Sequence, residues 1–211
     1  MSTGCSLQTL PFLWDRICGN DSMEQPEMVT LADQDKDKRV NVLLLTHQDG
    51  VEARPDFLTA DQDLASALTQ ELVEMFKASK ENVSIMPASV VRRYKNEHPD
   101  WYMDLPAVGK HFKADYVVYV ELANVDLYEK NSYPPFYRGQ ADVSVSAIDL
   151  HHPDQDDKRQ TFREQYPPDG PRDATDYNAH QFYQLFIGDM AQHLARFFAP
   201  HAYDAKLSAP N

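Results

Sequence analysis

Residues 40–46 (VNVLLLT) form a nearly unbroken apolar run directly after the charged stretch 33–39. A short run of this kind, without alternation of polar and apolar side chains, is typical of a strand that is buried on both faces. The run therefore predicts the first strand of a sheet. A strand of this kind needs other elements to cover it, and the segments that follow have the patterns of helices and of further strands.

Helical spacing follows the first strand. Apolar side chains recur every three or four residues at Leu64, Leu68, Leu72 and Phe76. This spacing predicts a helix of about five turns with one apolar face. Residues 59–62 (TADQ) match a capping box, in which the hydroxyl and the glutamine side chain each satisfy a backbone amide, so the helix is expected to begin there.

A second strand and two further helices are predicted next. Residues 83–86 have the length and composition of a short strand, and Pro87 suits the first turn of a helix. Asp104 is expected to cap a third, shorter helix. A crossover of this kind joins parallel strands, so the first half of the fold is predicted to be a βαβ unit.

The second half of the chain predicts antiparallel strands. Residues 116–128 are the strongest predicted strand, and their alternation changes phase near residues 123–124, which predicts a β-bulge. Residues 138–150 alternate cleanly and predict a hairpin partner, residues 160–166 a third strand, and residues 178–197 a final helix. The predicted fold class is α/β: a mixed sheet with a βαβ half followed by an antiparallel meander, with helices packed on the sheet.

The 211 residues are expected to form one domain with flanking segments. The segment after Cys18 is rich in Asp, Asn, Glu and Gln and predicts a linker. The predicted organisation is a lipoprotein-signal remnant with a flexible tether over residues 1–39, a single α/β domain over 40–200, and a disordered tail over 201–211.

Charge and hydropathy exclude two classes of protein. The chain carries 20 Lys and Arg against 33 Asp and Glu, a net charge of −13, and nucleic-acid binding needs basic residues that release counterions. Nucleic acids are therefore not expected as partners. No apolar run approaches the roughly 18 to 20 residues that cross a bilayer, so the polypeptide is not expected to span a membrane.

The opening residues MSTGC look like the end of a bacterial lipoprotein signal, with a small residue, Gly4, before the thiol of Cys5. Cys5 is the predicted lipidation site, and membrane contact is expected through this anchor only. Several acyl chains are needed for stable anchoring, and bacterial lipoproteins carry them on one cysteine. A disulfide between Cys5 and Cys18 is the competing interpretation.

Three patterns with ligand-binding chemistry are weak. The loop 47–55 has one glycine and two acids, which makes a poor phosphate site. Residues 33–37 (DQDKD) imitate a calcium loop, but lysine and leucine stand where the glycine and the glutamate belong. Residues 151–157 contain two adjacent histidines with acids, and adjacent side chains on an extended chain point apart. No metal and no cofactor is predicted.

No catalytic residue is predicted, because the chain has neither a nucleophile elbow nor a zinc-binding HExxH motif. The protein is therefore interpreted as a non-enzyme. A soluble hydrolase or transferase, with a site that the sequence does not reveal, is the alternative.

Aromatic residues, prolines and an arginine cluster at the predicted hairpin tip, where a short polar turn would suffice. Rigid aromatic side chains and arginine are enriched at protein-binding surfaces. The predicted partner-binding residues are Tyr128, Tyr133, Phe136, Tyr137, Arg138 and, in the connection before the third helix, Trp101. The alternative is that these rings fold back and cover the apolar face of the hairpin itself.

Residues 87–91 (PASVV), 104–112 (DLPAVGKHF) and 114–122 (ADYVVYVEL) resemble the periplasmic lipoprotein group around CsgG, LpoB and the amino-terminal domain of TolB. The resemblance covers about half the chain, which departs from the group at Val120-Glu121, where a glycine is common. It implies an α/β domain, a lipid anchor at the periplasmic face of the outer membrane, and a role in binding other proteins. It also implies that Met1 lies inside a signal peptide, and Ser6 resembles the residue after the cysteine in outer-membrane lipoproteins.

The predicted function is that of a lipid-anchored cell-envelope protein, a protein-binding or assembly module in secretion or cell-wall synthesis. The expected partner is another envelope protein, and homo-oligomerisation is left open. If the MSTGCS start is genuine, the chain would instead be cytoplasmic.

Overall fold

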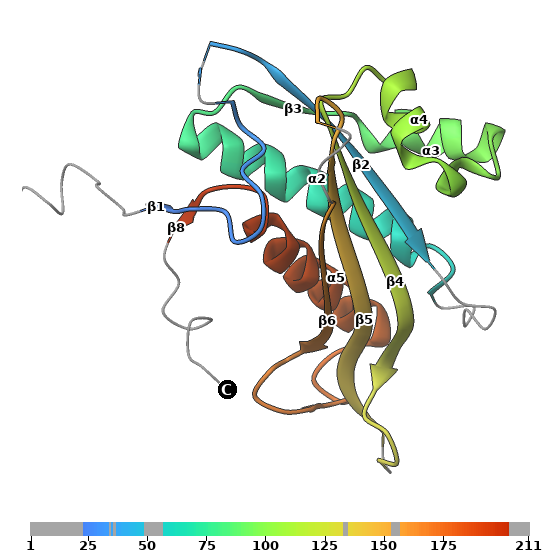
Figure 1. Cartoon of the computed structure of the whole chain (residues 1–211). Helices are drawn as coiled ribbons and strands as arrows, with labels where there is room; N and C mark the ends of the chain where they lie inside the picture. Colours follow the sequence, from blue (N-terminus) through green and yellow to red (C-terminus); the bar gives the residue numbers. More distant parts are fainter. Residues whose placement is uncertain are drawn as a thin grey trace, which may run out of the picture.

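A mixed sheet runs through the protein (Figure 1), and the computed structural model describes residues 23–33, 35, 37–48, 57–132, 135–152 and 157–202. The strand order is β3-β2-β4-β5-β6, and the short β7 pairs with β5 beyond the end of β6. The strands are β2 (Val40–Gln48), β3 (Val83–Ile85), β4 (Tyr116–Tyr128), β5 (Phe136–Asp149), β6 (Lys158–Tyr166) and β7 (Arg172–Asp173).

Strand directions divide the sheet into two halves. β3, β2 and β4 are parallel neighbours, whereas β4, β5 and β6 pair antiparallel. The predicted α/β fold, with a βαβ half followed by an antiparallel meander, is therefore confirmed. The predicted bulge is also present, because the β4–β5 register shifts after Ala123 and Asn124 has a φ of 52°.

Helices cover both faces of the sheet (Figure 1). α2 (Ala60–Ser79) and α5 (Ala179–Arg196) pack on one face, and α3 (Ala88–Glu97), the 3-10 turn η2 (Trp101–Met103) and α4 (Leu105–His111) lie on the other. Val42 and Leu44 of β2 belong to the first core, while Leu43 and Leu45 belong to the second. The run 40–46 is apolar at successive positions because β2 has a core on each face.

Side chains cap the starts of α4 and α5, whereas the start of α2 has no side-chain cap. Asp104 accepts a hydrogen bond from the backbone amide of Ala107 at 2.9 Å, and Asn178 forms a complete capping box with Gln181. The capping box predicted at residues 59–62 is wrong. The Thr59 hydroxyl donates to Asp63 Oδ2 at 3.0 Å and caps no backbone amide, although α2 does begin at Ala60.

The tether prediction needs a correction over residues 23–31, and the tail prediction over 201–202. β1 (Met23–Glu24) pairs antiparallel with β8 (His201–Ala202). The backbone amides of Glu27, Met28 and Val29 donate to the carbonyls of Arg196 and Phe197, and Leu31 is fully buried. The segment is polar on average, but a few apolar side chains are enough to attach it to the end of α5.

Candidate functional site

The carboxyl end of β2 lies where the chain changes direction across the sheet. The chain passes from β2 through α2 to β3 on one side, and then through α3 and α4 to β4 on the other. In open α/β sheets, ligands bind preferentially at such a switch point, outside the carboxyl ends of the parallel strands. The side chains at this position are therefore the first place to look for a site.

A mostly buried ion pair occupies this position. Lys95 Nζ donates to the backbone carbonyl of Thr46 at 2.6 Å and to Asp61 Oδ2 at 2.9 Å. The same ammonium lies 4.8 Å from the centroid of the Trp101 ring, within cation–π range. The lysine thus joins α3, the first turn of α2, the end of β2 and η2. A cavity of about 130 Å³ lies beside it, between β2, α2 and α3.

Three rings form what we call the aromatic platform: His47, Trp101 and Tyr102. His47 stacks on Tyr102 with ring centroids 5.2 Å apart and meets the edge of Trp101 at 5.8 Å. Trp101 is buried, whereas Tyr102 is 43% exposed and the neighbouring Met103 is 72% exposed. The predicted contact residue Trp101 is therefore the base of the platform in this chain, and Tyr102 and Met103 are the side chains that solvent reaches.

Most of the predicted hairpin-tip residues pack on the protein itself. Tyr137 is buried and stacks on Phe182 of α5 at 4.9 Å, with Tyr128 tilted against it at 5.5 Å. Arg138 Nη1 lies 3.2 Å from Glu129 Oε2, and Phe136 is half-buried. The alternative interpretation, in which the rings cover the hairpin, describes Tyr137. The remaining candidates Tyr133 and Cys5 lie outside the described residues.

Tyr128 lines a cavity of about 470 Å³, which we call the Tyr128 groove. Phe57, the start of α2, the end of β4 and the start of α5 form the other walls. Inside it, the Tyr183 hydroxyl and the Thr59 hydroxyl both donate to Asp63 Oδ2, at 2.8 and 3.0 Å. Burial, together with this carboxylate, raises the pKa of Tyr183, so the phenol stays protonated and keeps donating.

A second titratable cluster lies between β6 and α5. His193 Nδ1 is 2.6 Å from Glu164 Oε2, and Glu164 is buried. Burial and the nearby Glu164 raise the pKa of Asp189 to about 6, and the hydrogen bond to Glu164 raises the pKa of His193. A cavity of about 260 Å³ opens here, with Glu27 of the N-terminal segment on its wall. The sequence predicted the strand that carries Glu164 but gave no reason to connect this residue with α5.

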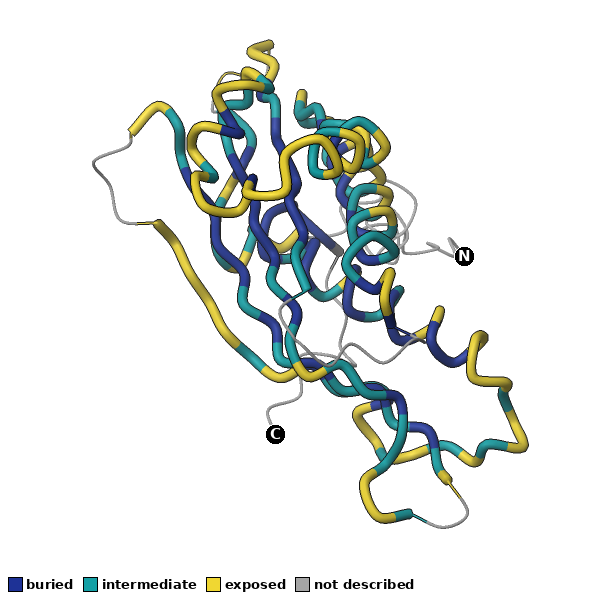
Figure 2. The backbone as a smooth tube through the Cα atoms, turned by 90° about the vertical axis from the view of Figure 1, so that its right-hand side faces the viewer, coloured by how far each residue is buried: buried dark blue, intermediate teal, exposed yellow. Residues whose placement is uncertain are grey.

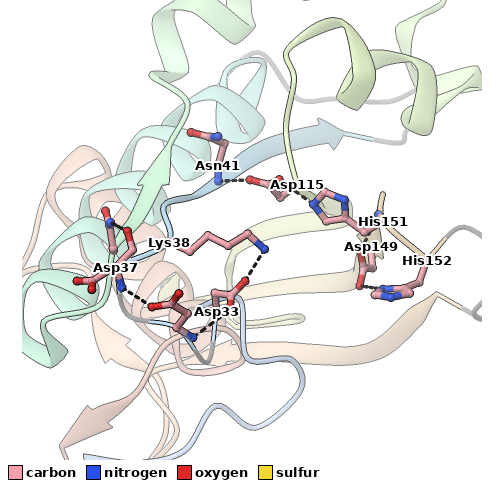
Figure 3. Close-up of polar contacts among 10 residues, drawn as sticks. Asp33, Asp37, Lys38, Asn41, Asp115, Asp149, His151 and His152 are labelled. Carbon is pink, nitrogen blue, oxygen red and sulfur yellow. Dashed lines mark hydrogen bonds and ion pairs between the residues drawn. The ribbon is translucent and has the colours of Figure 1, made fainter.

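The described residues of the 33–38 motif and the adjacent histidines 151–152 lie in one cluster at the opposite end of the sheet (Figure 3). Lys38 Nζ binds Asp33 Oδ2 at 2.6 Å, and the Asp33 and Asp35 carboxylates also accept local backbone amides. These carboxylates therefore do not converge on a cation position.

The adjacent histidines in the same cluster contact different carboxylates. His151 Nε2 lies 2.8 Å from Asp115, and His152 Nδ1 lies 2.9 Å from Asp149 (Figure 3). Within the described ranges, no three His, Cys, Asp or Glu side chains are placed to hold a metal ion. In the same part of the chain, no helix has the length and apolar character that a membrane span requires.

No protein-family model and no curated protein matches this chain. Among solved structures, lipoprotein GNA1162 from Neisseria meningitidis is 12% identical, with a TM-score of 0.43, over 74% of this chain and 98% of its own. A PelC dodecamer from Paraburkholderia phytofirmans is 13% identical, with a TM-score of 0.43, over 84% of this chain and 95% of its own.

A third solved structure, a minor lipoprotein from Acinetobacter baumannii, is 11% identical, with a TM-score of 0.32, over 74% of this chain and 89% of its own. Two of these three proteins are described as lipoproteins and one as a dodecamer. The identities and TM-scores are low, so we take no function from them.

Proposed function

We propose that this chain is a lipid-anchored cell-envelope protein whose α/β domain binds another envelope protein through the aromatic platform. The observation that carries the proposal is the exposure of Tyr102 and Met103 on a fixed base, Trp101, at the carboxyl end of β2. Tyrosine and methionine on a rigid support contribute contact area at low entropic cost, which is what protein-binding sites favour.

The position of the N-terminal segment is compatible with this role. Residues 27–29 bind the last turn of α5, whereas the first turn of α5 lines the Tyr128 groove. The 18 residues of α5 separate these two places by about 27 Å. The described part of the N-terminal segment therefore joins the domain at the end of α5 that is away from the Tyr128 groove.

The anchor is tested by labelling. With a complete signal peptide supplied upstream, the wild-type protein should incorporate palmitate and sediment with outer membranes, and Cys5→Ser should abolish both. Cys18→Ser is the matched control and should leave both unchanged. Labelling that persists in Cys5→Ser, or is lost equally in Cys18→Ser, would refute lipidation at Cys5.

The platform is tested by site-specific cross-linking in cells. A photoreactive phenylalanine analogue at Tyr102 should give one discrete adduct with an envelope protein, because a partner covers this ring. The same analogue at Glu74 is the control, because Glu74 is exposed on α2, which packs on the other face of the sheet from Trp101. No adduct at Tyr102, or the same adduct at both positions, would contradict the platform as the binding site.

One observation favours a second candidate function, a hydrolase or transferase. Glu164, Asp189 and His193 converge on the cavity of about 260 Å³, and two carboxyl groups in different environments can serve as acid and base. A panel of chromogenic esters, glycosides and phosphates tests it. Turnover that Asp189→Asn abolishes in a folded protein would favour the enzyme, and absence of turnover across the panel would count against it.

A further inference from the structure

The outer edge of β6 is the longest free strand edge of the sheet. β6 has nine residues and is the last strand in the order β3-β2-β4-β5-β6. Among the described residues, no backbone group pairs with its outer side. Residues 158–161 are exposed along the margin of the sheet (Figure 2). A row of unpaired amides and carbonyls of this length is a template for an added strand.

Proteins usually protect such edges, and most of the protective devices are missing from β6. The register of β6 with β5 is regular over all nine residue pairs, without a bulge. No proline lies within β6, and the strand is long. The opposite edge, β3, is protected by its length of only three residues. The edge of β6 is therefore continuous enough to accept a segment of several residues.

Charged side chains are the one protective feature that β6 does have, and their sign determines which kind of partner strand can pair with it. Lys158, Arg159 and Arg163 are exposed on this strand, although the whole chain carries a net charge of −13. Arg163 already binds Asp142 on β5 at 2.8 Å, whereas Lys158 and Arg159 have no ion-pair partner among the described residues. The free basic charge is therefore concentrated at the first half of the edge.

The same charges disfavour a second copy of this chain at the edge. In a parallel, in-register pairing of β6 with another β6, Lys158 and Arg159 would lie beside the same basic residues of the other strand, and like charges on neighbouring strands are destabilising. In an antiparallel pairing over all nine residues they would lie opposite Tyr166 and Gln165, which carry no negative charge. A strand with acidic side chains gains attraction at the same positions. The charge pattern therefore favours an acidic extended segment from a different protein.

We propose that the outer edge of β6 binds an extended, acidic segment of a partner protein as an added β-strand. Backbone hydrogen bonds to residues 158–163 hold the segment, and its carboxylates lie on the face of Arg159. Lys158 points to the opposite face and adds positive charge at the same end of the edge. Apolar side chains on the other phase of the segment lie beside Phe162, which is half-buried and packs against the α5-facing core. This surface is separate from the aromatic platform, and its test does not require the anchor at Cys5.

The experiment uses the full chain and a labelled nonapeptide of alternating Val and Glu, with a Val and Lys peptide as the charge-swapped probe. The Glu peptide should bind, and Lys158→Glu with Arg159→Glu should weaken it about tenfold or more while creating affinity for the Lys peptide. Arg92→Glu with Arg93→Glu, two exposed positions on α3, is the matched control and should change binding less than about twofold. Amide hydrogen exchange should slow at alternate residues of β6.

Each other outcome overturns the proposal. No binding of the Glu peptide up to about 1 mM would rule out the acidic segment. If the Lys158/Arg159 and Arg92/Arg93 variants lost equal affinity for the Glu peptide, the effect would come from the net charge of the chain and not from a site at β6. Protection that appears outside β6 would place the peptide elsewhere. Dimerisation of the free chain that Lys158→Glu changes would identify a second copy as the occupant.

Discussion

The Lys95 ammonium lies 2.9 Å from the Asp61 carboxylate, with both side chains 14% exposed, and so ties α3 to the first turn of α2. Asp61→Asn removes the negative charge but leaves the buried ammonium with the Thr46 carbonyl. We expect this change to lower the free energy of unfolding by about 1–3 kcal/mol, because a buried charge without its partner is costly. Urea unfolding at neutral pH measures it.

Removing both charges separates the ion pair from the general effect of changing Asp61. Asp61→Asn with Lys95→Met should be more stable than Asp61→Asn alone, because the unpaired charge is gone. If the loss of unfolding free energy in the double variant equalled the sum of the losses in Asp61→Asn and Lys95→Met, the pair would have no coupling energy.

The pKa of Asp189, raised to about 6 by burial and by Glu164, makes stability pH-dependent. A carboxyl group with a raised native-state pKa binds its proton more tightly when folded, so its contribution is present at low pH and is lost as the pH rises through about 6. Asp189→Asn should therefore stabilise the protein at pH 8 by about 1–2 kcal/mol, after allowing for partial exposure, and have little effect at pH 4.

The control for this prediction is Asp176→Asn, a substitution of an exposed aspartate before α5. Chemical unfolding at several pH values compares the two variants. His193 acts in the same direction, because its pKa is also raised and its contribution is lost above that pKa. An Asp189→Asn profile parallel to that of wild type would show that Asp189 does not titrate in this range.

Two glycines should respond in opposite ways to alanine. A Cβ at Gly139 of β5 would lie 2.5 Å from the Phe186 ring, whereas a Cβ at Gly188 of α5 would meet nothing within 4 Å. Gly139→Ala should destabilise the fold by about 1–3 kcal/mol through overpacking. Gly188→Ala should stabilise it by about 0.5–1 kcal/mol through helix propensity. Thermal unfolding of both variants measures the difference, and shifts of the same sign would contradict the packing of α5 on β5.

Replacing Asn178 at the start of α5 and Thr59 at the start of α2 by alanine should cost different amounts of stability. Asn178→Ala removes a side chain that accepts from the Gln181 amide at 2.8 Å, and should cost about 1 kcal/mol. Thr59→Ala removes a hydroxyl that caps no backbone amide of α2, so it should cost less. Equal losses in denaturant unfolding would mean that Thr59 caps α2 in solution.

The strands of the sheet could be predicted because the order of apolar and polar residues along each strand follows which of its faces are buried. The double-sided run 40–46 and the clean alternation of 138–150 each reflect which faces are covered. The capping box at 59–62 failed for a local reason, since the Thr59 hydroxyl binds the Asp63 carboxylate instead. The attachment of residues 23–31 was not predicted, because the segment is polar on average and this average does not reveal the one buried side chain, Leu31.

The candidate site was harder to predict because its parts are distant in sequence. Asp61 and Lys95 are 34 residues apart, and Glu164 and His193 are 29 apart, so no local pattern connects them. The sequence pointed to two aromatic segments as binding candidates, but composition could not separate the buried rings of Trp101 and Tyr137 from the exposed ring of Tyr102. That distinction depends on which strands and helices pack against each ring.

The attachment of the N-terminal segment has a mechanical consequence. Tension applied to the chain before residue 23 first meets the two residue pairs of β1 and β8, then the hydrogen bonds of residues 27–29, and then the buried Leu31. These contacts break one after another, and each break lengthens the free chain. The strands β2 to β6 carry load only after the last contact is lost, so the segment shields the sheet from force that arrives along the polypeptide.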